Sequence, residues 1–336
     1  MKISVIIPVR NEAQTIRPLI ARLKCQTETP SEIIITDTGS TDGTPEIIEE
    51  SSGGVLPVHL VRAGSGYPGR GRNLGAARAE NEWLAFIDAG VIPEADWLES
   101  LAGAVDGADK VDVVYGSFQP VTDTLFKECA AIAYVPPPAM VQGNLMRTRS
   151  IACALMRRSV WESVGGFPED LRSAEDLLFM DRIEAAGADI AYAPKALVHW
   201  NLQPTFAKTF SRFVTYSRNN IRAGLWAQWQ RTIVRRYLFL LLLALPAFFG
   251  GRSWLLYGLG LPVVAWLLML GVRSIIAIRR NRYSFPAGPG RNLRRLFLLV
   301  PLLAVIDLAA IVGSLQWLLS ERSFSSAENG GVHHDG

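Results

Sequence analysis

Short apolar runs alternate with amphipathic segments over the first 120 residues of the chain. The runs are rich in β-branched residues and apolar throughout, as expected for strands of a parallel sheet that is covered on both faces. Regular alternation of strands and helices predicts an α/β fold with a mostly parallel central sheet. Predicted strands cover residues 3–9, 32–36, 55–61 and 83–88, and predicted helices cover residues 12–24, 44–51 and 70–80.

The regular pattern weakens from Phe118 onward. The stretch 118–149 contains a triple proline and no clear period, which predicts a long loop with one helix. Loops of that length in compact domains are usually functional or mobile. Farther along, we predict a strand over residues 151–156, a helix over 175–186 and a short strand over 189–193 that ends at Pro194.

After His199 the character of the chain changes. Residues 205–236 mix Lys and Arg with aromatic side chains, a composition typical of helices that lie in a membrane interface. A solvated helix packed on the domain is the alternative. Three apolar runs follow, at 237–251, 254–272 and 296–319. The last two reach the roughly 20 residues that a bilayer core requires, whereas the first is marginal and pairs with the second as a tight hairpin.

These patterns divide the chain into four parts. We predict an α/β domain over residues 1–204, basic amphipathic interfacial helices over 205–236, a transmembrane region of about three helices over 237–319 and a polar tail over 320–336. Seven arginines lie between the second and third apolar runs. Because basic residues are retained on the cytoplasmic side, the α/β domain is expected in the cytoplasm, at the inner or plasma membrane of a bacterium.

The third apolar run contains a single acidic residue, Asp307. A charge at that depth is costly in lipid, so its side chain is expected to face protein or water. A structural ion pair and a place on a substrate path both remain open for this residue.

Composition and charge narrow the function classes. The 336 residues are 49% apolar and 19% charged, which excludes a disordered chain. Residues 1–200 carry 18 Lys and Arg against 27 Asp and Glu, whereas residues 201–336 carry 16 against 4. The basic residues are interleaved with apolar runs rather than with stacking aromatic residues and with polar residues that could recognise bases. This pattern argues against nucleic acid as a partner. The three scattered cysteines lack metal-site spacing and fit reduced thiols in the cytosol.

Two candidate ligand-binding segments follow predicted strands. The sequence TDTGSTDG at 36–43 places Asp37 at a strand end, where its carboxylate can accept hydrogen bonds from a base or a ribose. The sequence WLAFIDAG at 83–90 delivers Asp88 to the same edge, as a ligand for a divalent cation or a sugar hydroxyl. A capped turn is the structural alternative for the first segment.

Three further candidates lie elsewhere along the chain. The sequence GRGRNLGAARAE at 69–80 offers arginines at a helix start, where they can bind phosphate or form surface salt bridges. The sequence SAED at 173–176 ends in two carboxylates, which either stabilise the helix dipole or provide a general base. His199 contacts a metal or phosphate, or has a structural role.

Taken in order, these motifs resemble those of the family 2 glycosyltransferases, which have a nucleotide-sugar-binding GT-A fold. The resemblance runs from Lys2 to about Trp200 and includes the opening VIIPVRNE and the turn GGFPEDL. It implies that residues 1–204 are a GT-A catalytic domain. The resemblance also implies a role for individual residues. Pro8, Arg10 and Glu12 form part of the nucleotide pocket, Asp37 contacts the base, and Arg72 lies against the nucleotide. Asp88 is the first acid of the DxD motif, and Asp176 is the catalytic base, with Glu175 beside it.

Two positions depart from the family pattern. Thr38 stands where a second aspartate is common, and Gly90 replaces the second acid of the DxD motif. A divalent cation, Mg²⁺ or Mn²⁺, is therefore expected under one of two arrangements. Either Asp88 and His199 share the cation, or arginines replace part of its charge.

The resemblance implies an inverting transfer of sugar from a nucleotide-sugar donor. The QxxRW pattern of processive polysaccharide synthases is absent after Asp176, which favours one transfer per encounter. The membrane half favours a membrane-borne, lipid or lipid-linked acceptor. A membrane-anchored nucleotide-sugar-binding protein without catalysis is the alternative. A nucleotidyltransferase shares the α/β architecture but gives no reason for membrane spans.

Overall fold

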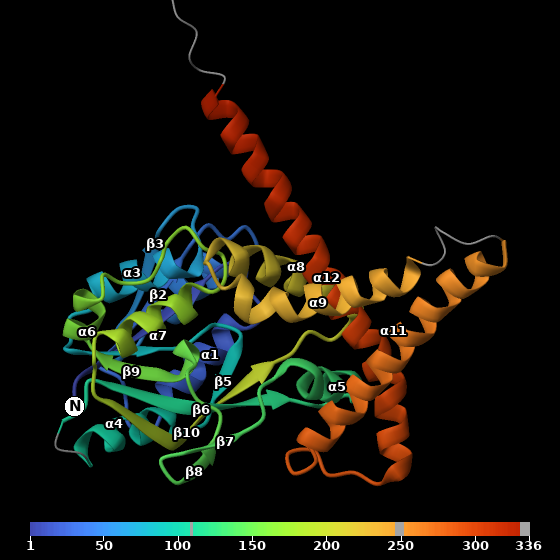
Figure 1. Ribbon diagram of the computed structural model, residues 1–336. Helices are drawn as coiled ribbons and strands as arrows, with labels where there is room; N and C mark the ends of the chain where they lie inside the picture. The colour runs from blue at the N-terminus through green and yellow to red at the C-terminus, as the bar shows by residue number, and fades with distance from the viewer. Residues whose placement is uncertain (108–109, 246–251, 330–336) are drawn as a thin grey trace, which may run out of the picture. The chain divides into compact units, whose positions relative to one another are not determined.

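The computed structural model describes residues 1–107, 110–245 and 252–329 (Figure 1). The chain forms two compact units. The first comprises Met1–Val121 and Pro136–Leu202, and the second comprises Thr122–Val135 and the residues from Gln203 onward. Because the second unit takes a segment from the middle of the first, the chain passes between the two units three times.

An eight-stranded sheet in the order β3-β2-β1-β4-β9-β6-β10-β5 organises the first unit (Figure 1). Strands β3, β2, β1 and β4 are parallel neighbours, and β6 and β10 are also parallel, whereas β9 and β5 run antiparallel to their neighbours. The expected α/β fold with a mostly parallel central sheet is confirmed. The strands of this sheet are β1 (Ile3–Val9), β2 (Glu32–Asp37), β3 (Val58–Arg62), β4 (Trp83–Phe86), β5 (Val91–Pro93), β6 (Val113–Val121), β9 (Ala154–Arg157) and β10 (Ile190–Asn201).

Helices cover both faces of this sheet, which explains the unbroken apolar runs of its strands. Along β1, Val5 and Ile7 pack into a core with α1, α2 and α4, while Ile6 points into a second core with α3, α6 and α7. Successive side chains of a strand point to opposite faces, so a strand covered on both sides is apolar at every position. The helices are α1 (Ile16–Lys24), α2 (Thr44–Ser51), α3 (Pro68–Arg78), α4 (Trp97–Asp106), α6 (Arg158–Ser163) and α7 (Glu175–Ala185).

The structure corrects several predicted boundaries in the first unit. The last strand does not end at Pro194 but continues to Asn201, with a shift of register between Tyr192 and Leu197. Proline cannot donate a ladder hydrogen bond, so the strand passes it at an irregularity rather than in regular pairing. The stretch 118–149 begins as the end of β6, and besides one helix it contains a small hairpin of β7 (Ala139–Val141) and β8 (Asn144–Met146).

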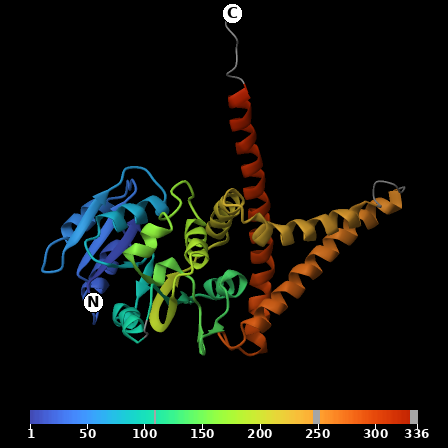
Figure 2. The ribbon, with the colours of Figure 1, turned by 60° about the vertical axis from the view of Figure 1, so that its left-hand side comes forward.

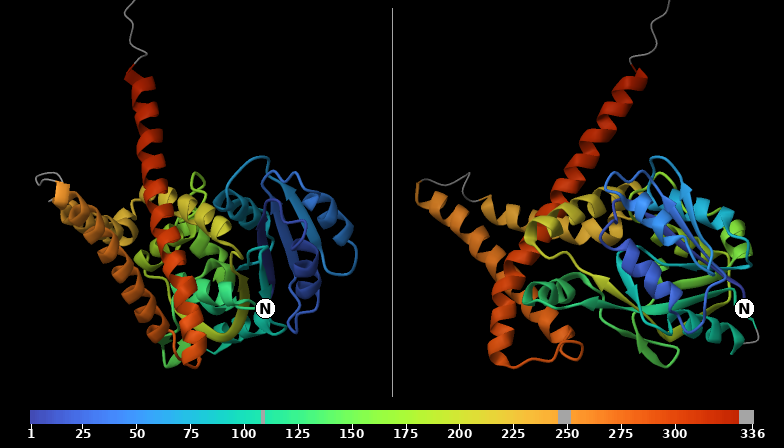
Figure 3. Two further views of the ribbon diagram at one scale, coloured as in Figure 1. Left: turned by 90° about the vertical axis from the view of Figure 1, so that its right-hand side faces the viewer. Right: turned by 180° about the vertical axis from the view of Figure 1, so that it is seen from behind.

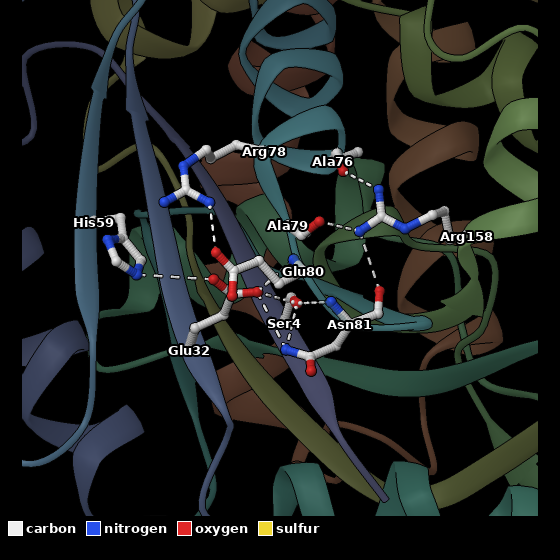
Figure 4. A network of polar contacts seen from close by, with 9 residues as sticks. All are labelled: Ser4, Glu32, His59, Ala76, Arg78, Ala79, Glu80, Asn81 and Arg158. Atoms are coloured by element: carbon white, nitrogen blue, oxygen red, sulfur yellow. Dashed lines mark hydrogen bonds and ion pairs between the residues drawn. The ribbon is translucent and has the colours of Figure 1, made fainter.

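A network of polar side chains joins the amino ends of the parallel strands (Figure 4). Glu32, at the start of β2, is buried and accepts hydrogen bonds from the Ser4 hydroxyl (2.7 Å), the Glu80 backbone N–H (2.7 Å) and the Asn81 side-chain amide (3.1 Å). Nearby, Arg158 donates to backbone carbonyl oxygens at the end of α3 and beyond it. These contacts hold the segment between α3 and β4 in place at the amino ends of the parallel strands.

The second unit consists of helices, which Figure 2 and Figure 3 show from further sides. Its helices are α5 (Leu125–Tyr134), α8 (Phe206–Arg222), α9 (Trp226–Ala244), α11 (Arg252–Arg280) and α12 (Pro289–Asn329). Glu128 of α5 is buried and forms ion pairs with Arg291 and Arg295 of α12. Two arginines on one buried carboxylate thus attach α5 to α12. In the sequence, α5 lies between the two segments of the first unit.

Helix α8 packs closely along α12. The Ser217 hydroxyl donates to the Ala310 carbonyl oxygen at 2.7 Å, and a Cβ at Gly313 would lie 2.4 Å from the Val214 carbonyl oxygen. The aromatic side chains of α8 also pack within the unit, since the Phe213 and Tyr134 rings lie 5.1 Å apart. Of the aromatic residues that suggested an interfacial stretch, Trp226 and Trp229 of α9 are half-exposed.

Two helical segments are long and apolar enough to cross a membrane, namely Gly260–Arg280 and Pro289–Ser320. They contain most of the second apolar run and all of the third. The first run, 237–251, belongs to α9 up to Ala244, and its residues 246–251 lie outside the described residues. The predicted polar tail begins as a continuation of α12, and its residues 330–336 lie outside the described residues as well.

Candidate functional site

The carboxyl ends of β2, β1 and β4 meet at one edge of the sheet, since these strands are parallel neighbours. Asp37 is the last residue of β2, and Asp88 follows the end of β4 by two residues. Asp37 is 5% exposed, and the Asp88 side chain is 43% exposed. Strand carboxyl ends in open α/β sheets are where ligands bind, so both carboxylates lie where the fold places a ligand site.

Two glycines allow α3 to approach this edge closely. A Cβ at Gly71 would lie 3.0 Å from Pro8 Cβ, and one at Gly75 would lie 2.6 Å from Ile6 Cγ2. No side chain larger than hydrogen fits the second position without displacing β1. This close packing brings Arg72, which follows Gly71 on α3, to the carboxyl end of the sheet.

Arg72 joins two carboxylates that are distant in sequence. Its Nη2 donates to Asp88 Oδ1 at 2.7 Å, and its Nη1 donates to Glu175 Oε1 at 2.7 Å. The Arg72 and Glu175 side chains are each 5% exposed, so this ion pair is buried. The Arg72 guanidinium also lies 5.4 Å from the centre of the Phe167 ring. Arg72 therefore holds the end of β4 and the start of α7 together.

The start of α7 contributes the last carboxylate of the cluster. Asp176 is half-buried, and one of its oxygens accepts the backbone N–H of Leu177 at 2.9 Å. The residue before the helix, Ala174, has a left-handed backbone with φ of 72°. A non-glycine residue in that region is strained, and such strain often occurs at functional sites. The backbone conformation of Ala174 determines the direction in which the first turn of α7 presents Glu175 and Asp176.

Burial and mutual repulsion perturb the ionisation of this cluster. Burial raises the pKa of Asp176, Arg72 opposes the rise, and the charge of Asp88 adds to it. Burial likewise raises the pKa of Glu175, against the effect of Arg72 and with that of Asp176. Burial alone would lower the pKa of Arg72, but the charges of Asp88 and Glu175 outweigh it and raise that pKa. Three carboxylates around one guanidinium form a negatively charged centre in which a carboxylate binds protons more readily than in water.

Asn73 fixes the turn that precedes α7. Its side chain accepts the Phe167 N–H (2.8 Å) and the Trp161 indole N–H (3.1 Å), and it donates to the Phe167 carbonyl oxygen (2.9 Å) and to Glu169 (2.9 Å). The Phe167 ring in turn stacks on Phe179 of α7. The sequence did not point to Phe167 as part of the site. No pattern in the sequence predicted that the helix containing GRGRN would pack against the turn containing GGFP.

The candidate nucleotide-side residues follow β1 and β2. Pro8 lies in β1, Arg10 is exposed just beyond it, and the Glu12 carboxylate accepts the Thr15 hydroxyl. Both oxygens of Asp37 accept the Ser40 backbone N–H, at 3.1 and 3.3 Å. The Arg72 guanidinium, on α3, is hydrogen-bonded to Asp88 and Glu175.

The loops that carry these residues are attached to each other. Asn11 accepts the Thr41 backbone N–H at 2.8 Å, and Asp42 accepts the Ala13 backbone N–H at 3.1 Å. Asn11 itself has a left-handed backbone, with φ of 57°. Asn11 and Asp42 were not among the predicted site residues, although an asparagine and an aspartate in polar loops are the residue types that form such turns. They fix the shape of the edge beside Asp37.

The two predicted metal ligands have different partners. Asp88 is paired with Arg72, whereas His199 Nε2 lies 2.6 Å from Glu94 Oε1. Across residues 1–107, 110–245 and 252–329, no group of three or more His, Cys, Asp and Glu side chains could hold a metal ion. Mg²⁺ in proteins often takes one or two carboxylates and completes its shell with substrate phosphates and waters. Asp88 fits that role as a single protein ligand, while a cation site made of protein groups alone does not fit these residues.

The sheet, the helices on both of its faces and the carboxylates at its edge define a GT-A fold of the kind found in glycosyltransferases. The crystal structure of TarS from Staphylococcus aureus resembles the chain with a TM-score of 0.51 and 20% sequence identity, over 84% of this chain and 53% of that one. At this identity the likeness shows the fold. Residues 4–165 match the family model described as "Glycosyl transferase family 2". Over these residues the chain is therefore similar to glycosyl transferase family 2.

Named relatives cover parts of the chain. The chain is 29% identical over 204 residues to "Pre-mycofactocin glycosyltransferase" of Mycobacterium tuberculosis, covering 58% of this chain and 42% of the relative. It is 32% identical over 203 residues to "Glycosyltransferase AglE" of Haloferax volcanii, covering 57% and 64%. It is 30% identical over 188 residues to "Poly(ribitol-phosphate) beta-N-acetylglucosaminyltransferase TarS" of Staphylococcus aureus, covering 53% and 32%. The chain thus spans about one to two thirds of the length of these relatives.

Proposed function

We propose that this protein is an inverting glycosyltransferase that moves one sugar from a nucleotide-sugar donor to a membrane-borne, lipid-linked acceptor. The observation that supports it most is the cluster of Asp88, Glu175 and Asp176 around Arg72, at the strand edge of a domain similar to glycosyl transferase family 2. The cluster joins residues that are about 100 positions apart in the sequence, so the fold itself assembles it.

The reaction is a single displacement at the anomeric carbon of the sugar. A hydroxyl oxygen of the acceptor forms the new bond to that carbon, while the bond from the carbon to the donor phosphate breaks. The electron pair of the broken bond leaves with the nucleoside diphosphate, and the hydroxyl proton passes to a carboxylate of the enzyme. Because the attacking and leaving oxygens lie on opposite sides of the carbon, the configuration inverts.

We assign the general base to Asp176 rather than Glu175. Glu175 is buried and already bound to Arg72, whereas Asp176 is half-buried. A general base works best when its pKa approaches the working pH, and burial raises the pKa of Asp176 in that direction. Glu175 then acts as a positioning residue that holds Arg72 and, through it, Asp88.

Positive charge near the leaving diphosphate stabilises the transition state more than the ground state. Divalent cations commonly serve this purpose in GT-A glycosyltransferases. We propose that Mg²⁺ or Mn²⁺ binds with the donor, with the Asp88 carboxylate as its protein ligand. Arg72 keeps that carboxylate oriented and reduces its charge, and Pro8, Arg10, Glu12 and Asp37 line the nucleotide side of the same edge.

The lipid-borne acceptor is inferred from the second unit. Two of its segments are long and apolar enough to cross a membrane. Between residues 231 and 295, ten arginines precede the first apolar run or lie between the second and third runs, whereas one, Arg252, lies between the first and second. Basic flanks favour the cytoplasmic side, so we place the catalytic unit in the cytoplasm. The name of the Staphylococcus relative specifies a poly(ribitol-phosphate) acceptor, which makes a soluble polymer the second candidate acceptor.

Two measurements on purified protein test the assignment against a non-catalytic binding protein. We expect Asp176→Asn to lower the rate of sugar transfer roughly 10²- to 10⁴-fold while the affinity for the donor nucleotide changes little. Asp181→Asn, which removes an exposed carboxylate from the same helix, is the matched control and is expected to keep the rate. Transfer that survives in Asp176→Asn removes this residue from its role. Donor binding without transfer in the wild-type protein supports the binding protein instead.

A further inference from the structure

A polar network around the buried Asp307 connects three helices of the second unit. Asp307 of α12 is 1% exposed and accepts two hydrogen bonds from Arg273 of α11, at 2.5 and 3.1 Å. The Tyr237 hydroxyl of α9 donates to the same carboxylate at 3.3 Å, and the Trp266 indole N–H donates to that hydroxyl at 3.2 Å. Both oxygens of Asp307 are thus occupied. The sequence predicted that this side chain would face protein or water, and in the structure it faces protein.

A second arginine lies beside this network. Arg236 precedes Tyr237 on α9, is half-buried and lies within electrostatic reach of Arg273 and Asp307. Within the described part of the chain, no group accepts a hydrogen bond from its guanidinium or forms an ion pair with it. Two guanidiniums against one carboxylate leave one positive charge without a partner.

The helices that form this network also carry exposed apolar side chains. Leu238 and Phe239 of α9, Leu267 and Leu268 of α11 and Leu308 of α12 are each at least half-exposed. They belong to the three helices that contribute the polar network. A ligand that satisfies both features has an anionic head and a hydrocarbon tail. Guanidinium binds phosphate through parallel N–H donors, so a phosphate head suits the unpaired arginine best.

We propose that Arg236, next to the Arg273–Asp307 pair, binds the phosphate head of a lipid whose hydrocarbon chain lies along the exposed leucines of α9 and α11. The network of Asp307, Arg273 and Tyr237 holds the helices in place and prevents Arg236 from pairing with Asp307. The site is independent of sugar transfer, since it uses no residue of the catalytic cluster. If the acceptor is lipid-borne, the site specifies that its carrier bears a phosphate.

Equilibrium binding of radiolabelled dodecyl phosphate to the full-length protein in an uncharged detergent tests the proposal. We expect saturable binding to the wild-type protein and a loss of affinity of roughly tenfold or more in Arg236→Gln. Arg235→Gln is the matched control, because it removes the same charge from the neighbouring, exposed position on the same helix. It is expected to change the affinity less than twofold. Equal losses in the two variants would show a general attraction of charge and overturn the site.

Competitors identify the source of the phosphate. We expect excess unlabelled dodecyl phosphate to displace the label, whereas dodecanol and millimolar inorganic phosphate leave most of it bound. Complete displacement by inorganic phosphate would overturn the lipid and indicate a site for free phosphate. Displacement by dodecanol would indicate an apolar site without head-group recognition.

Two further variants separate a local effect from misfolding and from catalysis. Arg236→Lys keeps the charge and is expected to bind with an affinity between those of the wild-type protein and Arg236→Gln. Binding by Arg236→Lys as weak as in Arg236→Gln, with donor binding intact in both, would contradict recognition by charge. Asp176→Asn is expected to bind dodecyl phosphate like the wild-type protein, so failure of the proposed transfer reaction leaves this test unaffected.

Discussion

Replacing Arg72 by methionine tests whether the buried ion pair assembles the site. The substitution keeps much of the apolar stem but removes the guanidinium that binds Glu175 and Asp88. The Glu175 side chain is 5% exposed, so the variant leaves a buried carboxylate without its cation. Removal of one partner of a buried pair typically costs about 3–5 kcal/mol of folding stability. For a unit of this size, that corresponds to a fall in melting temperature of roughly 6–20 °C.

The same variant has a definite pH dependence. Without Arg72, the main influence that lowers the pKa of Glu175 is lost, so this pKa rises further. The destabilisation is then largest at a pH above the raised pKa and shrinks as the pH falls and Glu175 takes up a proton. Arg72→Met combined with Glu175→Gln should recover most of the lost stability, because no unpaired charge remains buried. The assay is thermal unfolding of the purified protein at several pH values. A loss below about 1 kcal/mol, or no recovery in the double variant, would refute the reasoning.

Three more predictions concern the first unit. Because burial raises the pKa of Asp176, the acid limb of the pH profile of kcat/KM should lie above the ordinary carboxyl range of about 4, and a limb at or below that value would contradict this base. Glu32→Ala should lower the free energy of unfolding by about 2–4 kcal/mol, because it leaves the Ser4 hydroxyl and the Glu80 N–H without their acceptor. Denaturant titration measures this change, and a neutral variant would show that the network is dispensable. Gly75→Ala should lower the free energy of unfolding by about 1–3 kcal/mol in the same titration, because the added methyl group clashes with Ile6. Gly103→Ala on α4, which has open space around it, should be neutral or slightly stabilising. Similar effects at both sites would contradict the close packing of α3.

Strands β1, β2 and β4 could be predicted because each of them is buried on both faces. Such strands are apolar at every position, and the runs around Ile6, Ile34 and Ala85 therefore stand out from the polar turns between them. The edge strand β5 is only three residues long and follows a turn, so no periodicity marks it. The second half of β10 is hidden by Pro194, which usually ends a strand and here occurs at a shift of register.

The carboxylates of the site could be proposed from motifs, but their partners could not. Asp88 was proposed because a carboxylate that follows a buried strand is a ready ligand, and Asp176 because a carboxylate at a helix start can act as a general base. The resemblance to family 2 glycosyltransferases then implied the role of each. Arg72 lies between Asp88 and Glu175 because α3 approaches β1 closely. The glycines of α3 permit this approach, but their presence in the sequence does not predict it. The membership of α5 in the helical unit rests on the contact of Glu128 with two arginines more than 160 positions later. Pairings over such distances are set by packing and leave no local pattern.

The account depends most on transfer of sugar by Asp176 to an acceptor held in the membrane. Membranes that contain either the wild-type protein or Asp176→Asn are incubated with labelled UDP- and GDP-sugars, and the lipids are then extracted into organic solvent. The account predicts label in the lipid extract for at least one donor with the wild-type protein, and a loss of at least about 10²-fold with Asp176→Asn. Label that appears only in water-soluble product, or equal lipid labelling by both proteins, would contradict it.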